Sequence, residues 1–293
     1  MTVFAPQPTD DGSFTFFSAE FGQSFHSSYG AKSEALYKYV AATKLAERAL
    51  RGHLKILDIC YGLGYNSAAA LAEIWRVNPA CQVEIVALEI SSQVPQDAVT
   101  HGLLAQWPAP VPALLAELAT SGTVQDGRLV ARLEWGDARQ TIQSVRQQGF
   151  LADAIFLDPF SPTACPQLWT VEFLALVAAC CAADGLLATY SCAAAVRTAL
   201  VAAGLAVADM PAVGRKAPGT VASWNPQLIP ELSIIAQEHL LTKAAVPYRD
   251  PQLQDPIAQI IVRREMEQVD CLLKSTAQWK KRWFGQGDRT EST

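Results

Sequence analysis

The sequence predicts an α/β protein built on a doubly wound, mostly parallel sheet that closes with a C-terminal antiparallel hairpin. From residue 54 onward, short apolar runs typical of strands alternate with longer helical stretches. Alternating strands and helices favour a parallel sheet covered by helices on both faces. The alternation stops after residue 205, and the following segment 213–223 carries two glycines and a proline. Such a segment favours a closing hairpin over another strand–helix unit.

The expected elements follow from the spacing of apolar residues. The six expected strands are 55–60, 82–88, 129–133, 154–157, 185–190 and 205–208. The expected helices are 33–50, 66–77, 138–147, 169–182, 193–203 and a final helix from 256 to about 283. Residues 105–122, with three prolines near their start, are interpreted as an insertion between two strand–helix units.

Length and composition predict one large globular domain. The chain has 293 residues, and 50% of them are hydrophobic, which is enough to bury a sizeable core. We divide it into an N-terminal arm and helix (1–53), a core (54–226) and a C-terminal extension with a basic tail (227–293). Neither a membrane-spanning run nor a signal sequence is recognisable, so a cytoplasmic protein is expected.

Charge and cysteine usage limit the possible partners. The net charge of −5 does not by itself indicate nucleic-acid binding. The basic stretch Lys280-Lys281-Arg282, with tryptophans beside it, either contacts phosphate or forms a solvated tail. The seven cysteines contain no CxxC pair, which favours buried free thiols over a metal site or disulfides.

The strongest local feature is a turn after the first strand. Asp58 precedes Gly62 and Gly64, and an alanine-rich helix follows. Glycines let a ligand approach the backbone, and the helix N-terminus offers free N–H groups. A dinucleotide fingerprint would place glycine or alanine where Ser67 stands. The carboxylate of Asp58 instead suits a ligand with a positively charged sulfonium and an amino group; the alternative is a tight turn that binds nothing.

Two further acidic residues follow strands of the same sheet. Glu89 ends the second strand, where a carboxylate can accept both hydroxyls of a ribose, unless it is only a solvated strand-end charge. Asp137 and Ala138 follow the third strand. Asp137 can accept a hydrogen bond from an adenine amino group, or it can cap the helix that starts at Ala138.

A fourth carboxylate, Asp158, ends the strand 154–157 and precedes Pro159-Phe160-Ser161-Pro162. Open α/β sheets place their active sites at this end of the strands. Two prolines around an aromatic residue make a stiff loop that can hold a reacting group in place. The alternative is a carboxylate that only caps neighbouring backbone amides.

Together these motifs resemble the methyltransferase domain of the tRNA-modifying MnmC-like family, whose members are class I, Rossmann-like methyltransferases. The resemblance rests on the turn from Gly62 to Asn66, on Gly136-Asp137-Ala138, and on the run from Phe156 through Pro162 to Trp169. Phe25-His26-Ser27 with Glu34, and Gly214-Arg215-Lys216, are also similar.

The resemblance implies binding of S-adenosylmethionine and methylation of the aminomethyl group of a wobble uridine in tRNA. It assigns the cofactor to Gly62, Gly64, Glu89 and Asp137, and we add Asp58, Asn66 and Ala138 to this group. Asp158 is expected beside the target amine. Two departures bear on the substrate: 293 residues are too few for the flavin-dependent oxidoreductase domain of the bifunctional members, and Asp158-Pro159 replaces the family's usual Asp-Gly.

The expected reaction is an in-line transfer of the methyl group from the sulfonium to an amine nitrogen. Because the ordinary pKa of aspartate is about 3.9, we expect Asp158 to orient the amine rather than to act as a strong base. Phe160 is expected to shape the substrate pocket. Four more residues have two interpretations each, substrate contact or a purely structural role: His26 in the pocket, Trp169 stacking on a base, and Arg215 and Lys216 contacting phosphate.

Three other functions remain open from the sequence alone. One is methylation of a small-molecule amine at the same donor site. Another is a nicotinamide-dependent oxidoreductase, which would need a Tyr/Lys or His constellation that is not recognisable here. The third is a non-catalytic nucleotide-binding protein, which would have no reason to retain all these carboxylates and glycines together.

Overall fold

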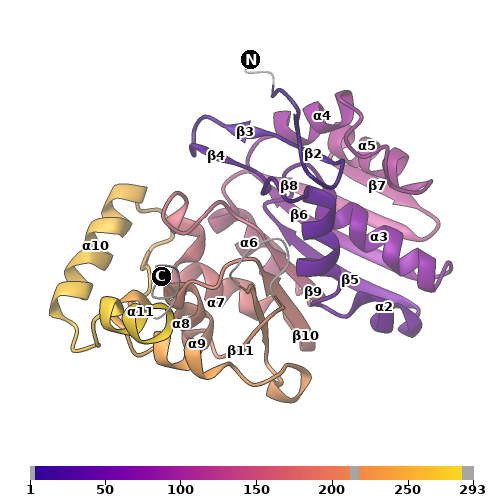
Figure 1. Ribbon diagram of the computed structural model, residues 1–293. Helices are drawn as coiled ribbons and strands as arrows, with labels where there is room; N and C mark the ends of the chain where they lie inside the picture. The colour runs from indigo at the N-terminus through magenta and orange to yellow at the C-terminus, as the bar shows by residue number, and fades with distance from the viewer. Residues whose placement is uncertain (1–3, 212–217, 286–293) are drawn as a thin grey trace, which may run out of the picture.

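The structure, a computed structural model, describes residues 4–211 and 218–285. Its centre is an eight-stranded sheet with the order β11-β12-β10-β9-β5-β6-β8-β7 (Figure 1). The strands are β5 (His53–Ile59), β6 (Gln82–Glu89), β7 (Thr123–Asp126), β8 (Leu129–Trp135), β9 (Ala152–Leu157), β10 (Cys181–Thr189), β11 (Ala206–Asp209) and β12 (Thr220–Ser223).

The strand directions confirm the predicted fold class. Strands β10, β9, β5, β6 and β8 are mutually parallel. Strand β12 runs antiparallel to both β10 and β11, which makes the expected closing hairpin. The sequence did not indicate β7, which pairs antiparallel with β8 at the opposite edge.

Helices cover both faces of the sheet because successive strand residues point to opposite sides. Leu54 and Ile56 belong to an apolar cluster with α3 (Tyr65–Val77) and α5 (Val111–Ser121). Leu57 and Ile59 belong to a second cluster on the other face. That face carries α6 (Ala138–Gln147), α7 (Val171–Ala179) and α8 (Ala194–Ala202). The predicted helix 169–182 was too long, because β10 already begins at Cys181.

The N-terminal segment forms a small arm of short strands, followed by an interrupted helical region. Short strands β1 (Gln7–Pro8), β2 (Phe14–Thr15), β3 (Phe17–Ser18) and β4 (Gln23–Ser24) pair in two hairpins. The predicted helix 33–50 is wrong as a single element. Helix α1 (Ala31–Glu34) and the π-helix η1 (Ala35–Val40) are separated from α2 (Leu45–Arg48) and η2 (Ala49–Arg51), because Lys44 has a left-handed backbone with φ 56°.

The predicted insertion contains α5, which follows α4 (Gln93–Thr100) and packs against it. The C-terminal extension contains η4 (Pro226–Leu228), α9 (Ile234–His239), η5 (Lys243–Ala245), α10 (Ile257–Asp270) and α11 (Thr276–Phe284). Helices α10 and α11 lie on the side of the molecule away from α3 and α5 (Figure 1). The single final helix we predicted is broken, because Lys274 exchanges backbone hydrogen bonds with residues 241 and 243. Within the described ranges, no helix combines the length and apolar character that crossing a membrane requires.

Candidate functional site

A cavity of about 260 Å³ lies at the carboxyl ends of the parallel strands. It is formed by the residues that follow β5, β6, β8, β9 and β10, and the N-terminal arm covers it. The lining consists of Phe4, Ser18, Glu20, Phe21, Gln23, Ser24, Phe25, Glu34, Cys60, Gly62, Leu88, Glu89, Ile90, Ser91, Val94, Gly136, Asp137, Ala138, Asp158, Pro159, Phe160, Ser161, Cys165, Gln167, Leu168 and Tyr190.

The two glycines of the turn have different surroundings. Gly62 lines the cavity with φ 56°, and a Cβ there would lie 3.5 Å from the ring of Phe25. Gly64 has φ 83°, and a Cβ there would lie only 2.6 Å from the hydroxyl of Tyr61. Gly64 does not line the cavity. Packing against Tyr61 therefore explains why position 64 is glycine. At position 62, the missing side chain leaves space in the cavity.

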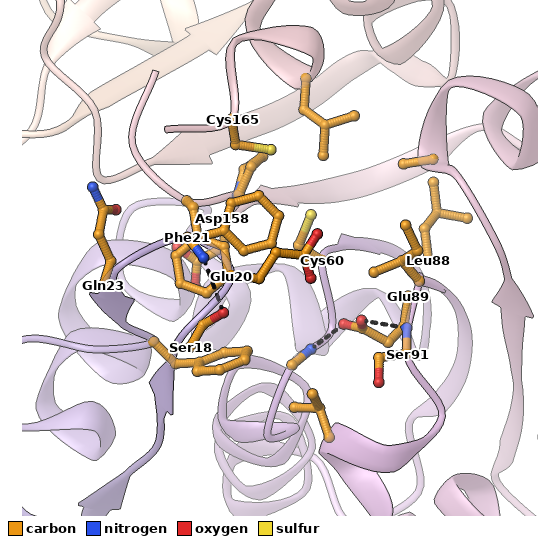
Figure 2. Close-up of a pocket in the computed structure, with 18 of the residues that line it drawn as sticks. Ser18, Glu20, Phe21, Gln23, Cys60, Leu88, Glu89, Ser91, Asp158 and Cys165 are labelled. Carbon is orange, nitrogen blue, oxygen red and sulfur yellow. Dashed lines mark hydrogen bonds between the residues drawn. The ribbon is translucent and has the colours of Figure 1, made fainter. Parts of the chain in front are cut away.

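Glu89 lines the cavity and is held by the backbone. Its Oε2 accepts the N–H of Gly62 at 2.8 Å, and its Oε1 accepts the N–H of Ser91 at 2.9 Å. Figure 2 shows both hydrogen bonds as dashed lines. Burial raises the pKa of Glu89, and these N–H groups oppose the rise. A carboxylate oxygen can accept two hydrogen bonds, so each oxygen keeps one lone pair for a ligand.

Asp58 lies behind the turn and does not line the cavity. Its side chain is fully buried and its Oδ2 accepts a 2.7 Å hydrogen bond from Ser67 Oγ, while its Oδ1 has no hydrogen-bond partner among the described residues. Burial raises the pKa of Asp58 to about 8. The carboxyl group is therefore mostly protonated at neutral pH, so the charge on which the sequence interpretation rested develops only above that range.

Asp137 serves as the N-cap of α6 and also lines the cavity. Its Oδ1 accepts the backbone N–H of Arg139 at 2.9 Å. The guanidinium of Arg139 contacts the same carboxylate, with 2.7 Å between Nη2 and Oδ2. Ala138, the first residue of the helix, lies beside it in the lining. The helix-capping interpretation is thus confirmed. The same side chain also lines the cavity.

Asp158 is the carboxylate that extends from the end of β9 into the cavity. Its Oδ2 accepts a 2.9 Å hydrogen bond from the amide Nδ2 of Asn66. Burial raises the pKa of Asp158 to about 7, although the Asn66 hydrogen bond lowers it. This corrects the expectation based on the ordinary pKa of aspartate. At neutral pH the group exists in both protonation states, so it can accept a proton as well as orient a ligand.

The loop after Asp158 is fixed from two sides. The hydroxyl of Tyr190 donates to the Pro159 carbonyl oxygen at 2.9 Å. The indole N–H of Trp169 donates to the Phe160 carbonyl oxygen at 2.8 Å. Trp169 is fully buried, so it cannot stack on a nucleobase in this structure. Its place in the core corrects the substrate-contact interpretation, because the indole holds the loop from behind.

An aromatic wall from the arm closes the cavity over Phe160. The rings of Phe21 and Phe160 stack with centroids 4.5 Å apart, and Phe25 meets Phe160 edge-on at 5.0 Å. Gln23 joins the two segments, since its Nε2 donates to Ser161 Oγ at 2.7 Å and its Oε1 accepts the Ser161 N–H at 3.2 Å. Figure 2 shows Phe21 near Asp158, with Glu89 and Ser91 across the cavity.

The cavity is acidic. Of the described residues, five carboxylates line it and no lysine or arginine does; the five are Glu20, Glu34, Glu89, Asp137 and Asp158. Burial would raise the pKa of Glu34, but its neighbours Lys38 and Ser27 lower it overall. Such a lining favours a cationic ligand.

Several predicted residues lie elsewhere. Asn66 is buried behind the cavity, where it contacts Asp158 rather than a ligand. His26 is half-buried, pairs with Thr15 Oγ1 at 3.2 Å through Nδ1, and does not line the cavity. Arg215 and Lys216 lie outside the described residues. Apart from Phe25 and Glu34, which the resemblance included, sequence reasoning missed the arm residues that line the cavity, because short irregular strands carry no periodic signal.

Comparison with known proteins gives the chain its family. A family model described as S-adenosyl-L-methionine-dependent methyltransferase matches residues 95–225. The crystal structure of MnmC2 from Aquifex aeolicus is 33% identical, with a TM-score of 0.79, and the match covers 92% of this chain and 87% of that one.

Curated relatives support the same family assignment. The tRNA 5-methylaminomethyl-2-thiouridine biosynthesis bifunctional protein MnmC of Aromatoleum aromaticum is 37% identical over 209 residues, which are 67% of this chain and 31% of that protein. Its namesake in Azoarcus sp. is 34% identical over 71% of this chain and 33% of its own length. The chain thus spans about a third of the length of these bifunctional relatives. The chain belongs to the MnmC-like family of S-adenosyl-L-methionine-dependent methyltransferases.

Proposed function

We propose that this methyltransferase acts on a primary amine, the aminomethyl group of a wobble-uridine side chain in tRNA. The observation that carries the proposal is the half-buried carboxyl group of Asp158, which lines an acidic cavity closed by Phe21, Phe25 and Phe160. Membership in the family contradicts two alternatives left open by the sequence, the nicotinamide-dependent oxidoreductase and the non-catalytic nucleotide-binding protein.

The residues across the cavity from Asp158 fit S-adenosylmethionine. Gly62 leaves open space beside the turn, and Glu89 keeps one lone pair on each oxygen for the two ribose hydroxyls. Asp137 and Ala138 would face the adenine. The Oδ1 atom of Asp58, behind the turn, has no hydrogen-bond partner among the described residues and would be left for a hydrogen bond with the amino group of the cofactor if that group reaches behind the turn.

The bound cofactor supplies an electrophilic methyl group on a sulfonium. The protein then has to present an amine lone pair in line with it, because alignment of reacting atoms lowers the barrier. Asp158 would accept an N–H hydrogen bond from the amine and hold its orientation. With a pKa of about 7, the carboxylate can also take a proton as the nitrogen acquires its fourth bond, and then release it to solvent.

The acidic lining and the aromatic wall have complementary roles in this proposal. The carboxylates favour an ammonium-bearing substrate over an anionic one. The rings of the arm exclude water from the reacting nitrogen, which strengthens its contacts with Asp158. The names of the bifunctional relatives, which describe tRNA 5-methylaminomethyl-2-thiouridine biosynthesis, support an aminomethylated uridine as the substrate.

Methyl transfer to three acceptors tests the proposal. Radiolabelled S-adenosylmethionine would be incubated with tRNA carrying 5-aminomethyluridine, with the same tRNA carrying unmodified uridine, and with free primary alkylamines. We expect label only in the aminomethylated tRNA. Asp158→Asn should lower the rate about 100-fold or more, whereas Asp126→Asn, at the exposed end of β7, should leave it unchanged.

Each other outcome has a defined meaning. Label in free amines alone would make the protein a small-molecule amine methyltransferase. Label in unmodified tRNA would place the acceptor atom on another nucleoside. Full activity of Asp158→Asn on the aminomethylated tRNA would contradict the role assigned to this carboxylate.

A further inference from the structure

We propose that Asp250, in the C-terminal extension, is a positioning residue of the cofactor site that acts through Arg139 on Asp137. The inference rests on the adenine contact proposed above for Asp137. Asp250 lies beyond residues 95–225, the part of the chain that the family model matches. The proposal assigns a function to a segment of the C-terminal extension in which the sequence analysis named no functional residue.

The guanidinium of Arg139 joins the cavity to the extension. On the cavity side, its Nε lies 3.2 Å from Oδ1 and 3.1 Å from Oδ2 of Asp137, and its Nη2 lies 2.7 Å from Oδ2. On the other side, its Nη1 donates to Asp250 Oδ2 at 2.8 Å and to the Asp255 carbonyl oxygen at 3.0 Å. The planar arginine fork suits such a bridge between two carboxylates.

Asp250 is itself rigidly held. Its side chain has no exposed surface, and its Oδ1 accepts the backbone N–H groups of Gln254 and Asp255, each at 3.1 Å. Its own backbone N–H donates to Glu172 Oε2 at 2.8 Å, in the first turn of α7. The anchor of the bridge is therefore the most buried of the three charged groups and is tied to a core helix.

The exposed fraction of the three side chains increases from the extension toward the cavity. Asp250 is 0% exposed, Arg139 is 13% exposed and Asp137 is 36% exposed. The outer carboxylate lines the cavity and is the most exposed of the three, whereas the inner one is enclosed and accepts two backbone N–H groups. Because Arg139 is fixed by Asp250, the carboxylate of Asp137 is held in one orientation toward the cavity.

This arrangement predicts an effect on base selectivity as well as on stability. A carboxylate held in place accepts a hydrogen bond from the 6-amino group of adenine and opposes a 6-oxo group, which has no donor. If Arg139 lost its anchor, Oδ2 of Asp137 could move with the guanidinium, while Oδ1 would keep its bond to the backbone N–H of Arg139. Affinity for the adenine compound would then fall more than affinity for its 6-oxo analogue.

The experiment compares binding of S-adenosylhomocysteine and S-inosylhomocysteine by calorimetry, with a thermal melt of every variant. The isosteric Asp250→Asn removes the charge and leaves one acceptor oxygen for donors on two sides, Nη1 of Arg139 and the backbone N–H groups of residues 254 and 255. Asp255→Asn is the matched control: it removes the 2.7 Å ion pair with Arg263 from the same loop but keeps the carbonyl contact to Arg139. The unaltered protein should prefer the adenine compound by about tenfold or more, as one hydrogen bond to a charged group provides.

Asp250→Asn should reduce that preference at least threefold, and Asp255→Asn should retain it. Equal weakening of both ligands in Asp250→Asn would mean a merely structural residue and would overturn the proposal. If Asp250→Asn does not fold, Arg139→Lys provides the second test, because one ammonium cannot span both carboxylates as the fork does. An unchanged preference in Arg139→Lys would equally overturn it.

Asp137→Ala, which removes the acceptor itself, separates this inference from the proposed adenine contact on which it rests. If this variant retains the preference for adenine, the adenine contact is misassigned. If Asp137→Ala loses the preference while Asp250→Asn retains it, the adenine contact stands and only the bridge to the extension fails.

Discussion

The amide nitrogen of Asn66 donates a 2.9 Å hydrogen bond to Oδ2 of Asp158, and so links the first turn of α3 to the end of β9. The two residues are 92 positions apart in the sequence. The glycine turn, which we expected to serve the cofactor alone, thereby also fixes the carboxylate on the substrate side of the cavity.

Asn66→Ala should slow methyl transfer and shift its pH dependence. The Asn66 N–H favours the ionised carboxylate, so its loss raises the pKa of Asp158 and moves the rise of activity to higher pH. We expect kcat to fall about tenfold at pH 7, with little change in the dissociation constant of S-adenosylmethionine. An unshifted pH profile, measured from pH 5.5 to 9.5, would argue against the coupling.

Activity should rise with pH through about 7 as Asp158 ionises. Below that pH the protonated carboxyl cannot accept a proton from the amine. Loss of a proton from the ammonium form of the substrate, which gives the neutral nucleophile, adds a second rise at higher pH. Asp158→Asn should therefore lose the first rise and keep the second, and kcat/KM profiles of the two proteins would show which limb belongs to the carboxyl.

Asp58→Asn should stabilise the protein at alkaline pH. Because the pKa of Asp58 is raised to about 8 in the folded state, the folded chain holds a proton there that the unfolded chain has lost. Stability associated with this group is thus present at acidic pH and declines as pH rises from about 4 through 8.

The neutral amide removes that decline and can still accept the Ser67 hydrogen bond. We expect a smaller drop in Tm between pH 6 and pH 9 than in the unaltered protein, measured by thermal melts, together with weaker binding of S-adenosylmethionine. An equal drop in Tm would mean that Asp58 is already ionised in the folded protein.

Alanine at the two glycines of the turn should have different effects. At Gly64, the new Cβ would meet the Tyr61 hydroxyl at 2.6 Å in a left-handed backbone, so the main loss should be stability. At Gly62, the Cβ meets Phe25 at an ordinary 3.5 Å and takes space from the cavity. There we expect a backbone strain of about 1–2 kcal/mol and a larger loss of cofactor affinity.

Tm and the dissociation constant of S-adenosylhomocysteine, measured on both variants, would test this contrast. The outcome against it is a Gly62→Ala protein that binds the cofactor product normally.

Gln23→Ala should loosen the arm without touching the cofactor end. It removes both hydrogen bonds to Ser161, so the ring contacts of Phe21 and Phe25 with Phe160 are left to hold the arm against the loop. We expect KM for the acceptor to rise about threefold to tenfold, with the affinity for S-adenosylhomocysteine unchanged. Gln7→Ala, at an exposed position of the arm, is the control. Equal KM values in both variants would leave Gln23 without a role in acceptor binding.

Much of the fold could be predicted because its signals are local. The strand ending at Ile59 is a contiguous apolar run, and the glycines and the helix that follow it occupy adjacent positions. The carboxylates Glu89, Asp137 and Asp158 could be assigned to one edge because parallel strands end together. All three line the cavity.

Other features depended on contacts that no local pattern reports. The sequence left two interpretations for Trp169, stacking on a base or packing in the core. The side chain is fully buried in the structure. The helix 33–50 had good apolar spacing, but the left-handed Lys44 interrupts it.

The sequence by itself determined the α/β fold class and the position of the carboxylates at the strand ends, since strand periodicity and turn chemistry are encoded in neighbouring residues; the methyltransferase activity was implied by the resemblance of its motifs to a known family. Only the tertiary structure decided how those carboxylates behave. The pKa of Asp158 depends on burial, and the anchoring of the site depends on the pairs Gln23–Ser161 and Arg139–Asp250, whose members are 138 and 111 residues apart. Desolvation and long-range pairing arise when distant segments pack together, and no spacing along the chain records them.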